Sequence, residues 1–502
     1  MIKNKFFHLD CTLRDGGYYN NWNFGSNLIQ RYLDIMAEIN IDYVEIGFRS
    51  LDNKELKGPC AYSTDEFINS FKIPKKLNIA VMINASEIVR YSSVKKNIDI
   101  VKKLFKKSSK SKVKLVRIAS HYYEIEKLTP IIKKIKSLGY KIALNLMQIS
   151  DRSDFEIKNF CTLAKKNKVD VIYFADSTGS LDREKTKKIS QIFKNFWNGD
   201  LGIHSHDNMD KAMENTITAL NNGVNWVDST VLGMGRGPGN IKTENLLIEL
   251  GKKRKKKINL TNLLRLVDDD FEKMKNKYRW GSNPYYYLSG MYGIHPTFVQ
   301  TMLEIKSFTS SEILTIIDHL KTIGGKQFSK DLIATYKQNF TGSSNGTYTP
   351  EKNLKNKEVL IIGSGPGIKK NKKNVEKFIK INKPFVIVLN SQKNINSKLI
   401  NLRVLCNILR LLTDHQSFKY LPQKLVLPYQ RLSNSIKQKF QKVKKLDFGV
   451  EIKNNTFKFN KSSAIIPNSL AISYALAIAN SGKAKRVYLA GFDGYDINNP
   501  KR

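Results

Sequence analysis

The chain has 502 residues, 41% of them hydrophobic, and a formal net charge of +41 at pH 7. This length predicts two or three domains, and no apolar run approaches the roughly 18 residues that a membrane span needs. The N-terminus lacks the apolar core of a signal peptide. The cysteines are scattered without a CxxC pair, which is typical of a reducing compartment. We therefore expect a cytoplasmic protein with no membrane span, disulfide framework or structural zinc site.

The positive charge does not by itself predict a nucleic-acid-binding protein. Lysines are spread over the whole chain, and the densest run, GKKRKKKINL at 251–260, has no interleaved aromatic residues that could stack on bases. The pattern favours a lysine-rich solvated surface, which would still attract anionic substrates or anionic lipid. We do not expect nucleic acid as a partner.

Eight short apolar segments recur over the first 235 residues, with longer segments of helical spacing between them. The eight segments are FFHLDCTL (6–13), YVEIGF (43–48), LNIAVMIN (77–84), KLVRIA (114–119), KIALNLM (141–147), VIYFADS (171–177), LGIHSHD (201–207) and WVDSTVLGMG (226–235). Alternating strands and helices imply a parallel sheet with right-handed crossovers. Eight units in roughly 250 residues match a TIM (β/α)8 barrel, with an open doubly wound sheet as the alternative. We predict an α/β protein whose barrel domain covers residues 1–280.

Polar side chains gather at the ends of these predicted strands, where TIM-barrel enzymes keep their active sites. They are Arg14 and Asp15 on the first strand, Glu45 on the second, Asn145 and Gln148 on the fifth, Asp176 and Ser177 on the sixth, and His204, His206 and Asp207 on the seventh. A barrel core does not need this many polar groups at one mouth. We expect the two glycines after Asp15 to turn the chain away beneath them.

The triplet HSH in the seventh segment is the most informative sign of a metal site. Side chains at positions i and i+2 of a strand share a face, so His204 and His206 can reach one ion together. Asp15 can close the ring from the first strand, although two buried core histidines remain the alternative for such a pair. Mixed histidine and carboxylate ligation with open positions suits Mn²⁺, Mg²⁺ or Fe²⁺ as a Lewis acid. The loop GMGRGPGN at 233–240 allows close backbone approach, and Asn240 would add a further oxygen ligand.

Three motifs in chain order, DCTLRDG, HSHDN and GMGRGPGN, resemble the DRE-TIM metallolyases. That superfamily includes 4-hydroxy-2-oxovalerate aldolase, 3-hydroxy-3-methylglutaryl-CoA lyase (HMG-CoA lyase) and isopropylmalate synthase. The resemblance spans residues 6–250, and YFADSTGS at 173–180 is most similar to the aldolase branch. It implies an aldolase that holds Mn²⁺ or Mg²⁺. Through a pyruvate enolate, such an enzyme cleaves a 4-hydroxy-2-oxo acid into pyruvate and an aldehyde, or forms one.

The resemblance also implies a role for each matched residue. The metal positions are Asp15, His204, His206 and Asn240, the enolate-stabilising arginine is Arg14, and the substrate-contacting serine is Ser177. Glu45 and Asn145, at neighbouring strand ends, are further candidates for substrate binding.

One position departs from the aldolase branch, which has a histidine base three residues after its metal aspartate. Here that position is Tyr18. An unperturbed tyrosine titrates near 10, so Tyr18 is a poor base at neutral pH unless the metal or Arg14 lowers its pKa. The other candidates are Tyr292 and His295, in the segment SGMYGIHPTF that resembles the helical extension of that branch. The change leaves open a Claisen-type synthase of the isopropylmalate synthase kind, or a catalytically inactive barrel that carries a nucleotide-sugar domain.

The second half of the chain predicts two further parts. Residues 281–350 contain an aromatic cluster, amphipathic helices and a polar linker, so we expect a helical extension that contributes to a homo-oligomer. Residues 351–502 begin with KEVLIIGSGPG, a strand that enters a glycine turn before a helix, and this predicts a Rossmann-like α/β domain. The pairing of such a domain with an aldolase predicts a role in surface-carbohydrate biosynthesis.

A nucleotide is the ligand that this last domain would take. The candidate positions are Gly363, Gly365, Gly367 and Asn390. The dinucleotide fingerprint GxGxxG is not met, and the next strand, PFVIVLN, ends in Asn390 instead of an acidic residue, which argues against NAD. GSGPG, LNS and VYLAGFDGYD resemble a bacterial sialyltransferase-like nucleotide-sugar fold. The alternative is an α/β domain without a ligand, and since the chain stops soon after GFDGYD, a truncated domain is one interpretation.

Overall fold

The computed structural model describes residues 6–51, 57–254, 258–305, 308, 310–329, 332–333, 344–432, 434–453, 455–468 and 470–493. Parts of the predicted basic run (255–257), of the linker (341–343) and of the last motif (494–496) lie outside the described residues. The chain divides into two compact units, Met1–Ser329 and Lys330–Arg502. Within the described ranges, no helix has the length and apolar character needed to cross a bilayer.

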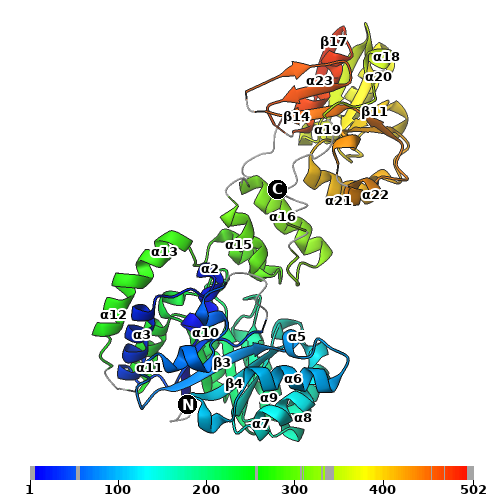
Figure 1. The fold of residues 1–502 in the computed structure, drawn as a ribbon. Coiled ribbons are helices and arrows are strands. Elements are labelled where there is room, and N and C mark those ends of the chain that lie inside the picture. Colours follow the sequence, from blue (N-terminus) through cyan, green and yellow to red (C-terminus); the bar gives the residue numbers. More distant parts are fainter. Residues whose placement is uncertain are drawn as a thin grey trace. The chain divides into compact units, whose positions relative to one another are not determined.

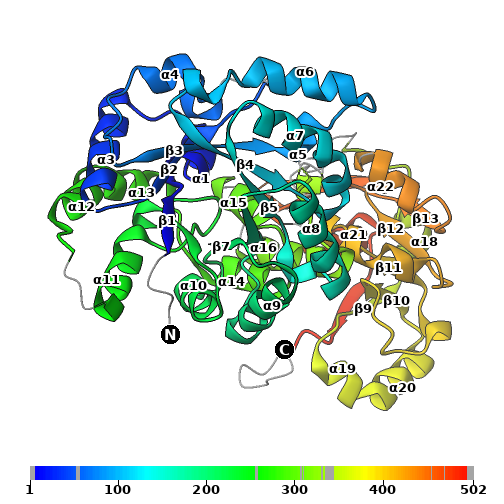
Figure 2. The same cartoon turned by 90° about the horizontal axis from the view of Figure 1, so that it is seen from below.

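Eight parallel strands form a closed barrel in the first unit, each paired with the next along the chain (Figures 1 and 2). They are β1 (Phe7–Asp10), β2 (Tyr43–Phe48), β3 (Asn78–Asn84), β4 (Val113–Ser120), β5 (Lys141–Leu146), β6 (Val171–Asp176), β7 (Asp200–Ser205) and β8 (Trp226–Ser229). β8 pairs in parallel with β1, with Phe7 opposite Trp226, and so closes the cylinder. The predicted TIM barrel is confirmed, and the open doubly wound sheet is excluded for this unit.

Helices surround the barrel (Figure 2). They are α3 (Ser26–Glu38), α4 (Asp65–Asn69), α5 (Ala85–Ile88), α6 (Val94–Leu104), α7 (Thr129–Ser137), α8 (Asp154–Lys166), α9 (Arg183–Phe196), α10 (Ala212–Asn221) and α11 (Thr243–Arg254). Apolar residues at helical spacing form one face of each longer helix. In α3, for example, Ile29, Leu33 and Met36 are buried. Lysines are frequent in α6, α7, α8 and α9, which accounts for part of the net positive charge.

The barrel interior changes from apolar to charged along the strands. Tyr43 and Trp226 open β2 and β8, and their ring centroids are 4.9 Å apart. Tyr173 packs against the same tryptophan at 6.3 Å. The guanidinium of Arg117, farther along β4, lies 4.4 Å from the centre of the Tyr173 ring. The aromatic layer therefore seals one end of the barrel, and the charged groups lie on its other side, toward the carboxyl ends of the strands.

The first unit continues beyond the barrel with further helices. They are α12 (Thr261–Leu266), α13 (Glu272–Tyr278), α14 (Pro284–Met291), α15 (Pro296–Glu304) and α16 (Ser310–Ile323). α14 packs against α15 and α16. The predicted helical extension is thus present, and it belongs to the same compact unit as the barrel.

The second unit is built on an open parallel sheet, coloured yellow to red in Figure 1. The chain order of its elements is α18 (Glu351–Leu354), β9 (Glu358–Ile362), α19 (Pro366–Lys370), α20 (Lys372–Asn382), β10 (Phe385–Leu389), β11 (Leu402–Val404), α21 (Ile408–Phe418), β12 (Lys424–Leu427), α22 (Asn434–Lys439), β13 (Lys445–Asp447), β14 (Gly449–Ile452), β15 (Lys458–Phe459), β16 (Ser463–Ile466), α23 (Ala471–Ser481) and β17 (Arg486–Ala490). The main sheet has the order β13-β12-β11-β10-β9-β17, and β14, β16 and β15 form a smaller sheet. The strand order reverses between β9 and β17, which is where open α/β sheets bind ligands.

Candidate metal centre

The first strand ends earlier than predicted. β1 stops at Asp10, and Arg14 and Asp15 lie on a helical turn, α1 (Thr12–Asp15). The carboxylate of Asp10 holds the start of this turn, because its Oδ1 accepts the backbone N–H of Thr12 at 2.9 Å. The turn projects both functional side chains from the end of β1 into the barrel mouth.

The two glycines after this turn do not reverse the chain, contrary to our expectation. Gly16 has helical backbone angles, with φ −65°, and Gly17 begins the next short helix, α2 (Gly17–Asn20). What these positions need is space, because any side chain on Gly17 would overlap the indole of Trp22. That indole donates from Nε1 to the carbonyl of Arg14 at 2.8 Å. The glycines therefore allow the tryptophan to fix the turn that carries Arg14.

Asp15, His204 and His206 converge on one buried point. Oδ2 of Asp15 lies 3.3 Å from Nε2 of His204 and 3.5 Å from Nε2 of His206. All three side chains are buried. One ligand atom from each lies within 4.8 Å of the other two, a spacing that could hold a metal ion.

The second ring nitrogen of each histidine already has a partner. Nδ1 of His204 lies 2.9 Å from Oδ2 of Asp228, and Nδ1 of His206 lies 3.2 Å from the carbonyl of Ser177. With Nδ1 as the donor, each ring turns the lone pair of Nε2 toward Asp15, and such partners fix the tautomer of metal-binding histidines. Within the described residues, Oδ2 of Asp15 and Nε2 of His206 have no hydrogen-bond partner. Buried polar atoms without partners are rare, and these fit a cation between them.

Asn240 lies beside the same point. It forms an isolated antiparallel bridge with His206, and its Nδ2 is 3.3 Å from Nε2 of His204. Its Oδ1 is buried without a partner among the described residues. Because a side chain at Gly235 would overlap this oxygen, the glycine leaves room for the asparagine. The four residues predicted as metal ligands are thus brought together, and they fit a divalent cation.

A closed ring of charged side chains holds this group. Arg14 donates to Asp15 and to Glu45, both at 2.7 Å. Arg117 lies 3.3 Å from Glu45 and 2.6 Å from Asp228. Asp228 in turn contacts His204, which closes the ring. Three carboxylates and two guanidiniums leave one net negative charge, which suits a divalent cation. The ring also buries Glu45 fully beside the two arginines, so that substrate binding by Glu45 stays a prediction.

Sequence reasoning missed Arg117 and Asp228. Arg117 is fully buried in the middle of the apolar segment KLVRIA. An arginine in such a place is almost never buried unless it is paired, and that signal could have been used. Asp228 is two residues from Trp226 on β8, so both point into the barrel.

Burial and the ring together set the ionisation of the metal-binding group. Burial would raise the pKa of Asp15, but the Arg14 guanidinium holds it well below its usual value. Burial would lower the pKa of His204, but the carboxylates of Asp15 and Asp228 raise it instead. For His206 burial prevails and lowers the pKa to about 4. The charged carboxylate of Asp15 and the neutral imidazole of His206 are the states in which these two groups bind metal.

A cavity of about 60 Å³ adjoins these groups at the barrel mouth. Its lining consists of Arg14, Asp15, Tyr18, Phe48, Met82, Asn84, Ala119, Asn145, Met147, Ala175, Ser177, His204, His206 and Arg236. Several predicted site residues therefore meet at one cavity. Oγ of Ser177 accepts the backbone N–H of Gln148 at 3.0 Å, and Oδ1 of Asn145 is buried without a partner among the described residues. Arg236, from the glycine loop, was not singled out from the sequence.

Tyr18 faces the cavity as a phenol. Burial raises its pKa, although the nearby Arg236 opposes this effect. The guanidinium carbon of Arg236 lies 5.6 Å from the centre of the ring. A tyrosine with a raised pKa stays protonated at neutral pH and donates hydrogen bonds, which favours a different group as the base.

The other two candidates for the base lie on the extension. The ring of Tyr292, at the end of α14, is covered by the ammonium of Lys321 at 4.1 Å. His295 caps α15, and its Nδ1 accepts the N–H of Thr297 at 3.4 Å. Burial lowers the pKa of His295 well below its usual value, with help from Arg236. His295 is therefore a neutral imidazole at neutral pH, close enough to the mouth to be influenced by its charges.

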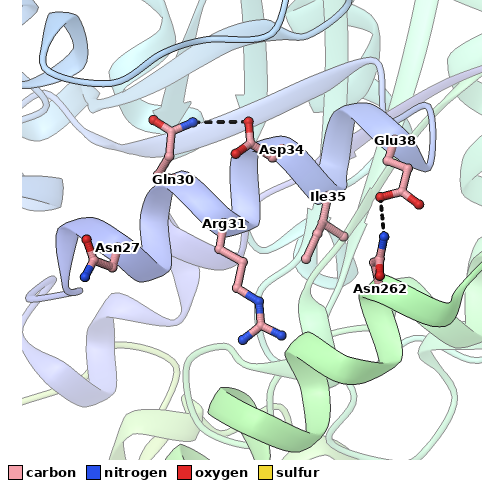
Figure 3. A pocket seen from close by; sticks show the side chains of 7 residues that line it. All are labelled: Asn27, Gln30, Arg31, Asp34, Ile35, Glu38 and Asn262. Atoms are coloured by element: carbon pink, nitrogen blue, oxygen red, sulfur yellow. Dashed lines mark hydrogen bonds between the residues drawn. The ribbon is translucent and has the colours of Figure 1, made fainter.

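A second groove lies outside the barrel, between α3 and α12 (Figure 3). It is lined by Asn27, Gln30, Arg31, Asp34, Ile35, Glu38 and Asn262. Its charged groups pair with each other or with neighbours: Asn262 donates to Glu38 at 2.8 Å, and Arg31 contacts Asp269 and Asp270. The groove lacks the converging unpartnered atoms of the barrel mouth.

In the second unit, the predicted nucleotide positions lie at the reversal of strand order. The backbone N–H groups of Gly363 and Gly365 donate to the carbonyls of Ala490 and Gly491 at 2.8 and 2.9 Å. The N–H of Gly367 donates to the carboxylate of Asp493 at 2.6 Å. Asn390 follows β10 with φ +57°. An anion at this turn would have to displace the carboxylate of Asp493, so nucleotide binding stays a prediction.

Comparison with known proteins identifies relatives of the first unit. A family model described as HMGL-like matches residues 5–269. The chain is 24% identical to an oxaloacetate decarboxylase of Mycobacterium tuberculosis over 293 residues, 57% of this chain and 82% of the relative. It is 28% identical to a 4-hydroxy-2-oxovalerate aldolase of Geobacillus thermodenitrificans over 247 residues, 48% of this chain and 68% of the relative. The N-terminal domain of a provisionally named aldolase from Bacteroides vulgatus matches with a TM-score of 0.55 and 29% identity, covering 61% of this chain and 99% of that one.

Proposed function

The chain belongs to the HMGL-like family, and on that premise we propose that it is a divalent-metal-dependent lyase that breaks a carbon–carbon bond of a 2-oxo acid and releases pyruvate. The observation that carries this proposal is the convergence of Asp15, His204 and His206, where Oδ2 of Asp15 and Nε2 of His206 are buried without a hydrogen-bond partner among the described residues. The aldolase and decarboxylase named above support it, because both break a bond to C3 of a 2-oxo acid.

Arg14 is placed to stabilise the charge that this bond cleavage creates. A divalent cation, Mn²⁺ or Mg²⁺, held by Asp15, His204, His206 and Asn240 would supply a Lewis acid for the 2-oxo group. Arg14 donates from two of its five N–H groups to Asp15 and Glu45, and its side chain is among those that line the cavity. Preorganised donors of this kind lower the barrier where negative charge develops.

For a 4-hydroxy-2-oxo acid the proposed step is a retro-aldol cleavage. The proton of the 4-hydroxyl group leaves, the C3–C4 bond breaks, the aldehyde departs, and the electron pair moves into the enolate of pyruvate. Protonation at C3 then gives pyruvate. The phenol of Tyr18, which lines the cavity, is placed to protonate C3. His295, on the extension and outside the cavity lining, is the candidate acceptor of the hydroxyl proton, because it is a neutral imidazole at neutral pH.

Decarboxylation of oxaloacetate is the second candidate reaction, since it forms the same enolate with carbon dioxide as the leaving group. The decarboxylase relative, matched over 82% of its length, favours it. A role of the whole chain in surface-carbohydrate biosynthesis stays a prediction, as does the homo-oligomer.

Metal binding and pyruvate release test the proposal. The purified chain is stripped with a chelator and reloaded with Mn²⁺ or Mg²⁺. Bound Mn²⁺ is measured by electron paramagnetic resonance, and pyruvate by coupling to lactate dehydrogenase, with 4-hydroxy-2-oxopentanoate and oxaloacetate as substrates. We expect metal-dependent pyruvate release from at least one substrate, faster than with the same concentration of free Mn²⁺. A chain that binds Mn²⁺ but does not accelerate either reaction would overturn the proposal. Free CoA release from acetyl-CoA would identify the Claisen-type synthase instead.

A further inference from the structure

We infer that Arg236 binds a second carboxylate of the substrate, so that the site takes dicarboxylic 2-oxo acids; this inference rests on the proposed function. Arg236 lines the same cavity as Arg14 and the metal-binding group. Its Nη2 donates to the carbonyl of Ser177 at 3.3 Å, and its guanidinium lies over the ring of Tyr18. Its Nε is buried without a hydrogen-bond partner among the described residues.

The other arginines inside the barrel are compensated by carboxylates. Arg14 and Arg117 each contact two, and Arg49 contacts Asp65 at 3.1 Å. Arg236 has no carboxylate within ion-pairing distance in the part of the chain that the structure describes. A cation held in a partly dehydrated cavity without a counter-charge attracts an anion, and the planar fork of arginine matches a carboxylate.

The loop that carries Arg236 is held in place from two sides. The N–H of Gly237 donates to Oε1 of Gln300 on α15 at 3.0 Å. The carbonyl of Gly237 accepts the hydroxyl of Tyr19, on α2, at 2.5 Å. Gly237 has φ +65°, a conformation that glycine adopts without strain. The guanidinium is thus positioned before any ligand arrives, which lowers the entropy cost of binding.

The metal-binding group and Arg236 would each take one of the two carboxylates of such a substrate. The carboxylate next to the 2-oxo group would lie at the metal, where Asp15 and the histidines converge. A monocarboxylic 2-oxo acid would then leave Arg236 without an anionic partner. A second carboxylate at the far end of the substrate would fill that position, and the structure therefore assigns the preference for diacids to Arg236.

A matched pair of unreactive ligands tests this inference. Both 2-oxopentanedioate and 2-oxopentanoate have a five-carbon chain and no 4-hydroxyl group, and they differ in a terminal carboxylate against a methyl group. Calorimetry on the full Mn²⁺-loaded chain is expected to show tighter binding of the diacid by about 10- to 100-fold, as a charged hydrogen bond provides. The ratio of the affinities for the diacid and the monoacid is expected to be mostly lost in Arg236→Gln and partly kept in Arg236→Lys. Arg183→Gln, which removes the same charge from the exposed start of α9, is expected to keep the full ratio.

The outcomes separate this inference from the proposed function. Equal affinities of the two ligands for the wild-type chain, or an unchanged ratio in Arg236→Gln, would overturn the inference even where pyruvate is released. A diacid preference that depends on Arg236 in a chain that releases no pyruvate would uphold the binding position and refute the lyase.

Discussion

The barrel mouth and the glycine turn of the second unit both follow the carboxyl ends of parallel strands, yet their polar atoms differ in one respect. At the mouth, Oδ2 of Asp15 and Nε2 of His206 are buried without partners among the described residues. At the turn, the N–H groups of Gly363, Gly365 and Gly367 all have acceptors within the unit. The first region is built around something that the protein chain does not supply. In the second region the glycine N–H groups already have acceptors, and among the described residues the buried Oδ1 of Asn390 is the polar atom of the predicted nucleotide positions that has no hydrogen-bond partner.

This difference shows what a glycine motif can and cannot indicate. The loop 233–240 carries Arg236 to the cavity, and its glycines make room for Asn240. Glycines at 363–367 make room for the backbone and carboxylate that follow β17. Both patterns look alike in sequence, because glycine reports only close approach. The unsatisfied polar atoms distinguish a ligand site from a structural turn.

The largest expected effect comes from neutralising one carboxylate in each region, Asp15 at the mouth and Asp493 at the glycine turn. Asp15→Asn removes the charge that faces both histidines while keeping the size of the side chain. We expect it to abolish Mn²⁺ binding, measured by electron paramagnetic resonance, and to lower pyruvate release by about 1,000-fold or more, since the Lewis acid is worth several kcal/mol. Asp493→Asn, the matched change at the glycine turn, is expected to alter neither quantity. Equal effects of the two substitutions would contradict the distinction between the regions.

The next effect concerns the charged ring. Asp228→Asn leaves the ligands of the metal in place but removes the carboxylate that orients His204 and pairs with Arg117. We expect Mn²⁺ affinity to fall by about 10- to 100-fold. The free energy of unfolding of the metal-free protein is expected to fall by about 3–5 kcal/mol, because a buried arginine loses a partner. Urea unfolding followed by tryptophan fluorescence reports on the first unit, since all four tryptophans lie in it. Undiminished Mn²⁺ affinity would show that the ring is not needed for the metal.

The sequence was sufficient for the barrel because its signal is repeated. Eight apolar segments at regular spacing predict eight parallel strands, and every segment repeats the same alternation of strand and helix. The end of β1 was predicted less well: FFHLDCTL is apolar to Leu13, but the strand stops at Asp10. The carboxylate of Asp10 captures the N–H of Thr12 and starts a helical turn, a local side-chain effect that hydrophobic periodicity does not register.

The site was predictable where residues share a strand or match a motif, and less so where contacts cross the barrel. The spacing of His204 and His206 is enough to place both on one face. The contact of Arg117 with Glu45 and Asp228 joins three strands, and no local pattern in the sequence encodes it. The same holds for the second unit, where the carboxylate of residue 493 reaches a turn more than a hundred residues earlier.

A smaller effect tests the space that glycine provides at the mouth. Gly235→Ala places a methyl group on Oδ1 of Asn240 and is expected to displace that side chain. We expect a loss of Mn²⁺ affinity of about 10-fold, similar to other changes that disturb a ligand indirectly. Gly25→Ala is the control, because a methyl group at Gly25 meets nothing within 4 Å. A Gly235→Ala variant with the Mn²⁺ affinity of the wild type would remove Asn240 from the proposed ligands.

The smallest expected effect is a pH dependence of stability that comes from the extension. His295 has its pKa held well below the usual value by burial, so the unfolded state binds a proton near pH 6.5 and the folded state does not. Stability therefore falls as pH drops below about 6.5, by up to about 1.4 kcal/mol per pH unit for this one group. His295→Asn keeps a residue that caps helices well but cannot titrate. Its unfolding free energy, from urea titrations of the metal-free protein between pH 7.5 and 5, should decline less steeply than that of the wild type. Parallel curves would mean that His295 is open to water and takes up a proton in the folded state as readily as in the unfolded state.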